Sequence, residues 1–295
     1  MQASEEMIVR REYLILFNMT GAVAMIMIDQ TVVGVILPAL QQAFDLGHNE
    51  LQWVVNGYTL ALGATLICGG WVGDRFGRFR AFISGVAIFT LASLGCALAP
   101  FSEILIGARI MQGIGAALMQ PSASAIVFSA FTAEKRSSAM STYIGVGMLF
   151  LAAGPLLGGF MIERLTWQSV FLINVPIGLI TIVFALIFSH PEPRLNPAPI
   201  DFIGVLLLVL GTVLLPVAIQ GAGDRSLSMA AVFSMAVIGI GAYAAIYFRR
   251  NSVDEPLLNF DLFKDRAFSG CCIILFCIQF AMLGQVVYGA IFVQN

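Results

Sequence analysis

Long apolar segments alternate with short polar ones along the whole 295-residue chain. About 20 helical residues cross the hydrocarbon core of a bilayer, and a helix satisfies its own backbone hydrogen bonds there. Apolar segments of sufficient length lie at about 14–37, 51–72, 81–99, 104–128, 139–162, 170–189, 202–220, 228–248 and 268–292. The pattern predicts an all-α polytopic membrane protein with about nine spans.

The composition supports this class and argues against several others. Hydrophobic residues make up 59% of the chain and charged residues 11%, whereas a soluble domain carries about 25% charge. The net charge of −2 does not indicate a nucleic-acid partner. The cysteines lack histidine partners at metal-ligand spacing, and the sequence contains no G-x-x-x-x-G-K-[ST] loop. We therefore expect no metal, no cofactor and no enzymatic activity, and no catalytic residue is assigned.

The basic residues fall mainly on one side of the predicted spans. With the N-terminus in the cytoplasm, the outer segments hold only Arg164 and Arg225. The inner segments then hold Arg10, Arg11, Arg75, Arg78, Arg80, Lys135, Arg136, Arg194, Arg249, Arg250, Lys264 and Arg266. Because Lys and Arg are enriched in cytoplasmic loops, this distribution predicts a cytoplasmic N-terminus.

Two connections divide the chain. The stretch HPEPRLNPAP, 190–199, contains four prolines and predicts a stiff linker after six spans. The stretch 249–268 alternates charged residues with Leu and Phe, so it is either an interfacial segment or a solvated linker. We expect a six-helix bundle in 1–189, a linker and a helix pair in 190–248, and an interfacial linker with the first helix of an incomplete bundle in 249–295.

The polar stretch GGWVGDRFGRFR, 69–80, is expected between the second and third spans on the inner side. It resembles the G-x-x-x-D-[RK]-x-G-[RK]-[RK] gating motif of the major facilitator superfamily. The matching residues are Gly70, Asp74, Arg75, Gly77 and Arg78. Phe79 departs from the last basic position, which Arg80 follows. Gly70 and Gly73 are expected to permit close helix approach. The alternative is an ordinary basic loop.

Arg109 lies within the fourth predicted span, in the stretch ARIMQGIGAALMQP. This stretch resembles the R-x-x-x-G-x-G-x-A motif of the same superfamily. Helical spacing places four further residues on the face of the arginine: Gln112, Gly113, Ala116 and Gln120. An arginine within a span normally faces the bundle interior or a wet cavity. The alternative is that Arg109 extends to the outer headgroups.

The fifth predicted span carries Gly154, Pro155, Gly158 and Gly159, in the stretch GPLLGG. These residues resemble the G-P-x-x-G-G motif of the superfamily's antiporters. Proline removes one helical hydrogen bond and bends the helix, and glycines let a neighbouring helix pack closely. A kinked packing helix without a transport role would carry the same residues.

Two further stretches resemble the fourteen-span drug:proton antiporters of this superfamily. In IDQTVVGVILP, the matching residues are Asp29, Thr31, Val32, Val33 and Pro38, whereas Gly34 and Ile36 depart from the family pattern. WQSVFLINVPIG, 167–178, and DFIG, 201–204, also match. The resemblance implies a six-helix N-terminal bundle of the major facilitator type, followed by an inserted helix pair and one further helix.

Asp29 is a carboxylate within the first predicted span, where it costs about 2.5–3.5 kcal/mol on insertion scales. We expect Asp29 and Arg109 to lie at similar depths, and in the family the helices that carry them line the central cavity. Asn18 and Met25 share the face of Asp29 and are expected to line the same cavity. Asp29 could then serve a proton and a cationic substrate alternately, or the pair could be static and hold the helices together.

The resemblance implies proton-coupled efflux of small hydrophobic or cationic compounds, as in multidrug exporters of a plasma membrane, here a bacterial inner membrane. The expected partners are a small-molecule substrate, protons and the lipid bilayer. The chain matches one half of such a protein, the inserted pair and one more helix. The alternative is therefore a truncated or split transporter fragment without transport of its own. A missing C-terminal half or a periplasmic adaptor protein would then be its partner.

Overall fold

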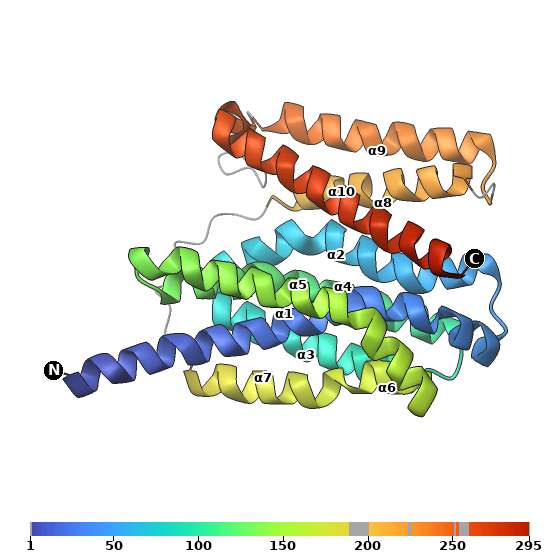
Figure 1. The fold of residues 1–295 in the computed structure, drawn as a ribbon. Helices are drawn as coiled ribbons and strands as arrows, with labels where there is room; N and C mark the ends of the chain where they lie inside the picture. Colours follow the sequence, from blue (N-terminus) through green and yellow to red (C-terminus); the bar gives the residue numbers. More distant parts are fainter. Residues whose placement is uncertain (1, 189–200, 224–225, 251, 254–259, 295) are drawn as a thin grey trace.

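The computed structural model describes residues 2–188, 201–223, 226–250, 252–253 and 260–294. In these residues the regular elements are all helices (Figure 1). Eight helical stretches among them are long and apolar enough to cross a membrane. This confirms the predicted class of an all-α polytopic membrane protein.

The first six predicted spans form one bundle, in which α4 lies between α2 and α3 and also contacts α1 (Figure 1). Its helices are α1 (Gln2–Phe44), α2 (His48–Phe76), α3 (Arg78–Ala97), α4 (Ser102–Ala130), α5 (Ala133–Arg164), α6 (Trp167–Leu172) and α7 (Asn174–Phe188). Buried apolar side chains from several of these helices fill the bundle, among them Met25, Phe89 and Met119. Most helices extend a few residues beyond the predicted spans, because their polar ends continue the helix past the apolar segment.

The sixth predicted span is divided into α6 and α7 at Ile173. Pro176 has no N–H group, so it cannot donate to the carbonyl of Leu172, four residues earlier. The last residue of α6 is Leu172, the residue whose carbonyl lacks this hydrogen bond. The missing bond therefore coincides with the end of α6. The division is a feature that apolar length alone did not predict.

The helices α8 (Phe202–Gly223) and α9 (Met229–Arg249) form a pair beside α2 (Figure 1). Arg249 forms an ion pair with Asp201 at 3.1 Å, which joins the end of α9 to the start of α8. On the α2 side, Asn56 donates to the Gln220 side-chain oxygen at 2.6 Å, and the Gln220 amide donates to Gln52. The pair is thus attached to the bundle by side-chain hydrogen bonds between α2 and α8.

The remaining described elements are η1 (Phe260–Lys264) and α10 (Arg266–Gln294). The predicted ninth span, 268–292, lies within α10, which has 29 residues. The predicted linker at 190–199 lies outside the described residues.

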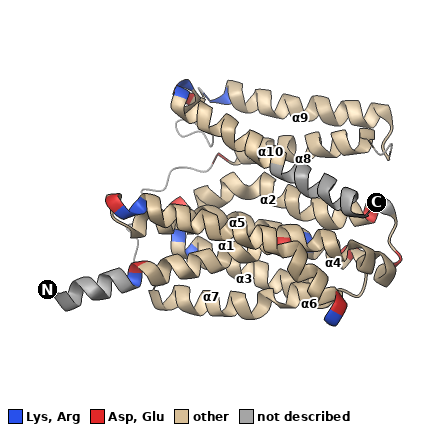
Figure 2. Ribbon diagram, viewed as in Figure 1, with Lys and Arg blue, Asp and Glu red and all other residues tan. Residues whose placement is uncertain are grey.

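Charged residues lie mainly towards the two ends of the helices, and the middle of the bundle is largely free of them (Figure 2). Many large apolar side chains are exposed on the helices, for example Leu91, Leu156 and Ile219. A water-soluble protein rarely exposes so much contiguous apolar surface, whereas a bilayer covers it. The arrangement is that of an integral membrane protein.

Candidate functional site

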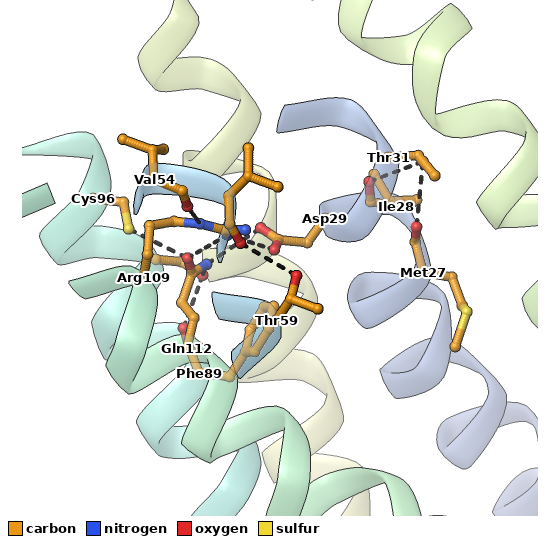
Figure 3. Close-up of polar contacts among 12 residues, drawn as sticks. Met27, Ile28, Asp29, Thr31, Val54, Thr59, Phe89, Cys96, Arg109 and Gln112 are labelled. Carbon is orange, nitrogen blue, oxygen red and sulfur yellow. Dashed lines mark hydrogen bonds and ion pairs between the residues drawn. The ribbon is translucent and has the colours of Figure 1, made fainter. Parts of the chain in front are cut away.

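An ion pair lies at the centre of the bundle, between α1 and α4. The Arg109 guanidinium donates from Nη1 to Asp29 Oδ2 at 2.5 Å (Figure 3). The two side chains are only 1% and 0% exposed, respectively. Arg109 therefore does not extend to the outer headgroups, because its guanidinium is buried in an ion pair with Asp29. The structure brings together the two charged residues that the sequence placed within spans.

Two further groups hold the Arg109 guanidinium in place. Its Nε donates to the backbone carbonyl of Val54 on α2 at 3.1 Å. The ring of Tyr58, one helical turn further along α2, lies 4.4 Å from the guanidinium carbon. An aromatic face at this distance attracts a cation. Arg109 thus links α4 to α1 and α2 at the same time.

Gln112 completes the network one turn along α4 from Arg109. Its side-chain oxygen accepts from Arg109 at 2.8 Å and from the Cys96 thiol at 3.3 Å. Its amide donates to Ser93 Oγ at 2.8 Å and to Asp29 Oδ1 at 3.4 Å (Figure 3). The face shared by Arg109 and Gln112 predicted their proximity. The contributions of Ser93 and Cys96 from α3 were not predicted, because small polar residues in an apolar span carry little distinguishing signal.

The energetic balance of this network depends on its completeness. Removing two charges from water costs several kcal/mol per ion, and their mutual attraction offsets this only with good geometry and further hydrogen bonds. Here Arg109 also donates to the Val54 carbonyl of α2, and Gln112 of α4 is hydrogen-bonded to both Arg109 and Asp29. Loss of one member would leave the other as an uncompensated buried charge, which is strongly destabilising.

The other predicted cavity residues lie elsewhere. Asn18 is buried and donates to the Thr181 carbonyl of α7 at 3.3 Å. Met25 is fully buried in the apolar core. Gln120 is half-buried on α4, two turns further from Arg109 than Gln112. Neighbouring helices cover Asn18 and Met25, whereas Gln120 is only partly covered. In this conformation they form no common polar site with Asp29.

The predicted gating residues lie at the turn between α2 and α3. Gly77 has a φ of 102°, a left-handed conformation that favours glycine. Across this turn, Arg78 forms an ion pair with Asp74 at 3.3 Å, and its Nη1 lies 3.5 Å from the Ala125 carbonyl of α4. The Arg75 guanidinium carbon lies 5.4 Å from the Trp71 ring. The motif residues thus link the adjoining ends of α2, α3 and α4.

One expectation about this loop needs correction. Gly70 was expected to permit close helix approach, but a Cβ there would make only ordinary contact with Pro121, at 3.7 Å. A Cβ on Gly69 would instead overlap the Ala117 carbonyl oxygen of α4. Gly113 has the corresponding role on α4, where a Cβ would overlap the Tyr58 carbonyl. The rotation of α2 turns Gly69, not Gly70, towards α4, and sequence spacing alone does not define that rotation.

Two of the antiporter-type glycines face α1. A Cβ on Gly154 would overlap Thr31, and one on Gly158 would lie 2.8 Å from Val32 Cγ2. Gly159 faces open space. Two of the glycines therefore permit the close packing of α5 on α1, as expected for this motif, and the third does not take part.

Comparison with known proteins agrees with this architecture. A family model described as Major Facilitator Superfamily matches residues 19–294. The chain belongs to this superfamily. Superfamily members are transporters, which agrees with the expectation that the chain is not an enzyme.

Several curated relatives of this superfamily are about one-third identical to the chain. The tetracenomycin C resistance and export protein of Streptomyces glaucescens is 32% identical over 282 residues, which cover 92% of this chain and 51% of that protein. The methylenomycin A resistance protein of Bacillus subtilis is 33% identical, with 91% and 58% coverage. The drug efflux pump JefA of Mycobacterium tuberculosis is 30% identical, with 89% and 52% coverage. The chain thus spans about half the length of these relatives.

Solved structures show the same fold. The POT family transporter PepTSo matches with a TM-score of 0.56 and 14% identity, and the match covers 84% of this chain and 55% of that one. At this identity the likeness concerns the fold alone.

Proposed function

We propose that the chain is the proton- and substrate-handling part of a proton-coupled exporter of small hydrophobic or cationic compounds. The observation that carries this proposal is the ion pair between Asp29 and Arg109, which is fully buried within membrane-spanning helices. Ionisable residues in such positions mark ion and substrate pathways. Export of this kind is also consistent with the relatives' names, which include resistance and efflux proteins.

The chemistry follows from the contacts of the carboxylate. When Asp29 takes up a proton, it no longer attracts the Arg109 guanidinium as a charge, and the link between α1 and α4 weakens. A cationic substrate that reaches Asp29 competes for the same carboxylate. One carboxylate that binds either a proton or a cation is sufficient for exchange of the two.

Exchange also requires movement, because the pair is enclosed in this conformation. The two charged side chains come from α1 and α4, the first helices of two three-helix units. In transporters of this architecture, such units are inverted repeats that surround a midplane site. Separation of α1 from α4 would open a path to Asp29, and reformation of the ion pair would close it. Asn18, Met25 and Gln120 would become accessible only in the open conformation.

The gating turn has a supporting role in this proposal. Arg78 and Asp74 hold the ends of α2, α3 and α4 together on the inner side.

We place the N-terminus in the cytoplasm and the protein in a plasma membrane, the inner membrane in a bacterium. A further polypeptide, such as a C-terminal half or a periplasmic adaptor protein, would be a natural partner.

The test is transport in reconstituted vesicles. The chain is incorporated into liposomes with a pH gradient, and ethidium serves as the cationic probe. We expect ethidium accumulation that depends on the gradient, and loss of this accumulation in Asp29→Asn, which cannot exchange the proton. Glu163→Gln is the matched control, because it removes an exposed carboxylate at the end of α5. Equal transport by Asp29→Asn and the unmodified chain would refute the coupling role.

A second candidate function rests on the length of the relatives, of which the chain spans about half. The chain would then be an assembly partner that transports nothing alone. Absence of ethidium accumulation by the unmodified chain, followed by its appearance on co-reconstitution with the C-terminal half of a relative, would support this alternative.

A further inference from the structure

The proline of α5 leaves one backbone carbonyl without its usual partner. Pro155 has no N–H, so the Leu151 carbonyl, four residues earlier, accepts no helical hydrogen bond from that position. A buried carbonyl without a partner is costly, and kinked membrane helices satisfy such groups through neighbouring side chains. The Thr31 hydroxyl of α1 lies 3.0 Å from the Leu151 oxygen and donates to it.

The geometry favours this acceptor over the alternatives within α1. Thr31 Oγ1 lies 3.3 Å from the Ile28 carbonyl and 3.4 Å from the Met27 carbonyl of its own helix. A hydroxyl carries one hydrogen, and its shortest contact is with Leu151. The carbonyls of α1 already have their own helical partners, whereas the Leu151 carbonyl does not.

The neighbouring glycine makes the contact possible. A Cβ on Gly154 would overlap Thr31 Oγ1, so any larger residue would push the hydroxyl away from α5. Two adjacent residues of one motif therefore have complementary effects. Pro155 leaves the Leu151 carbonyl without a helical donor, and Gly154 leaves space for the Thr31 hydroxyl that donates to it. The acceptor, the space and the donor meet at one point of the contact between α1 and α5.

We propose that Thr31 is a positioning residue that holds α1 against the kink of α5 and so presents Asp29 to Arg109. Residues two positions apart are about 200° apart on a helix. A bond from Thr31 to α5 therefore orients the opposite side of α1, which carries Asp29, towards α4. Loss of this hydrogen bond should therefore disturb the ion pair between Asp29 and Arg109, on which exchange depends. This last consequence rests on the proposed function, but the hydrogen bond does not.

A double-mutant cycle tests the hydrogen bond without any transport measurement. Thr31→Val keeps the shape of the side chain and removes the donor, so it should lower the thermal unfolding temperature in detergent. Thr31→Ser keeps the donor and should restore most of the loss. In Pro155→Ala, residue 155 regains an N–H and can satisfy the Leu151 carbonyl within α5. Thr31→Val should then have little further effect.

The alternative outcomes are distinct. If Thr31→Val lowers the unfolding temperature equally in the unmodified chain and in the Pro155→Ala background, the two residues act independently and the proposal is wrong. If Pro155→Ala does not fold, the stabilities of Thr31→Ser and Thr31→Val still test the hydrogen bond. Stability in the order threonine, serine, valine supports the hydrogen bond, whereas a valine variant more stable than the serine variant shows that packing alone matters.

Ethidium transport gives a separate measurement of positioning. Thr31→Val should reduce the maximal rate several-fold, with recovery in Thr31→Ser. If the unmodified chain transports no ethidium, the proposed function fails while the stability cycle still tests the hydrogen bond. If the cycle shows coupling but Thr31→Val transports at the normal rate, Thr31 only stabilises the helix contact and does not position Asp29.

Discussion

At the centre of the bundle, one guanidinium is shared between acceptors from different helices. Arg109 donates to Asp29 on α1, to the Val54 carbonyl on α2 and to Gln112 on its own helix. A lysine has a single ammonium group and cannot reproduce this planar fork of donors. The network thus depends on the shape of the arginine as well as on its charge.

Arg109→Ala should destabilise the protein by about 3–5 kcal/mol, because it leaves Asp29 buried as an unpaired charge. The double variant Asp29→Asn with Arg109→Ala should recover part of this loss, since no buried charge then remains. Unfolding in detergent, followed by circular dichroism, measures both. A double variant less stable than Arg109→Ala would show that the charges themselves do not dominate the energetics.

For single residues, the sequence indicated which side chains belong to the site better than it indicated which contacts they make. Asp29, Arg109 and Gln112 were recognisable because charged and amide groups are costly inside a span. Ser93 and Cys96 were not, because a helix accommodates such residues in many environments. The hydrogen bond from Thr31 was also missed, because it depends on the rotation of α1 against α5.

The helices themselves followed from apolar length, whereas their interfaces required the structure. The predicted span 104–128 lies within Ser102–Ala130, and the predicted span 81–99 overlaps most of Arg78–Ala97. The displacement of the tight contact from Gly70 to Gly69 is one residue, about 100° of helix rotation. Periodicity defines a face only to within such an angle, so it cannot select between adjacent glycines.

The antiporter-type stretch of α5 allows a matched comparison of two glycines. Gly154→Ala should lower stability, because its Cβ would overlap Thr31 and separate α5 from α1. Gly159→Ala should be tolerated, because no neighbouring atom lies within 4 Å of its Cβ position. The two variants add the same methyl group to the same helix. Thermal unfolding temperatures that fall equally would contradict the helix contact assigned to Gly154.

The bundle as a whole has two ends, and the prediction of orientation concerns which end faces the cytoplasm. Ser137 and Arg164 lie near opposite ends of α5. In a background without native cysteines, a membrane-impermeant maleimide should label Arg164→Cys in intact cells, and Ser137→Cys only after permeabilisation. Each position is the control for the other. The reverse pattern would place the N-terminus outside and contradict the distribution of basic residues.

The helix pair α8–α9 is the part of the molecule whose attachment is easiest to test. Gln220 accepts from Asn56 and donates to Gln52, so a single side chain satisfies two amides of α2. Gln220→Leu would remove both of these hydrogen bonds from a partly buried interface, and a typical intramolecular hydrogen bond contributes about 0.5–1.5 kcal/mol to stability. We therefore expect this variant to loosen the pair from the bundle without unfolding either part.

Disulfide formation between α2 and α8 measures this loosening. The Cβ position of Gly63 lies 3.8 Å from Thr212 Cγ2, so the double variant Gly63→Cys with Thr212→Cys should form a disulfide in a background without native cysteines. Adding Gln220→Leu should slow its formation several-fold. Ile219→Leu is the control, because its side chain is 74% exposed and makes no part of the amide cluster. An unchanged rate with Gln220→Leu would mean that apolar packing alone attaches the pair, and that the amides are satisfied in another way.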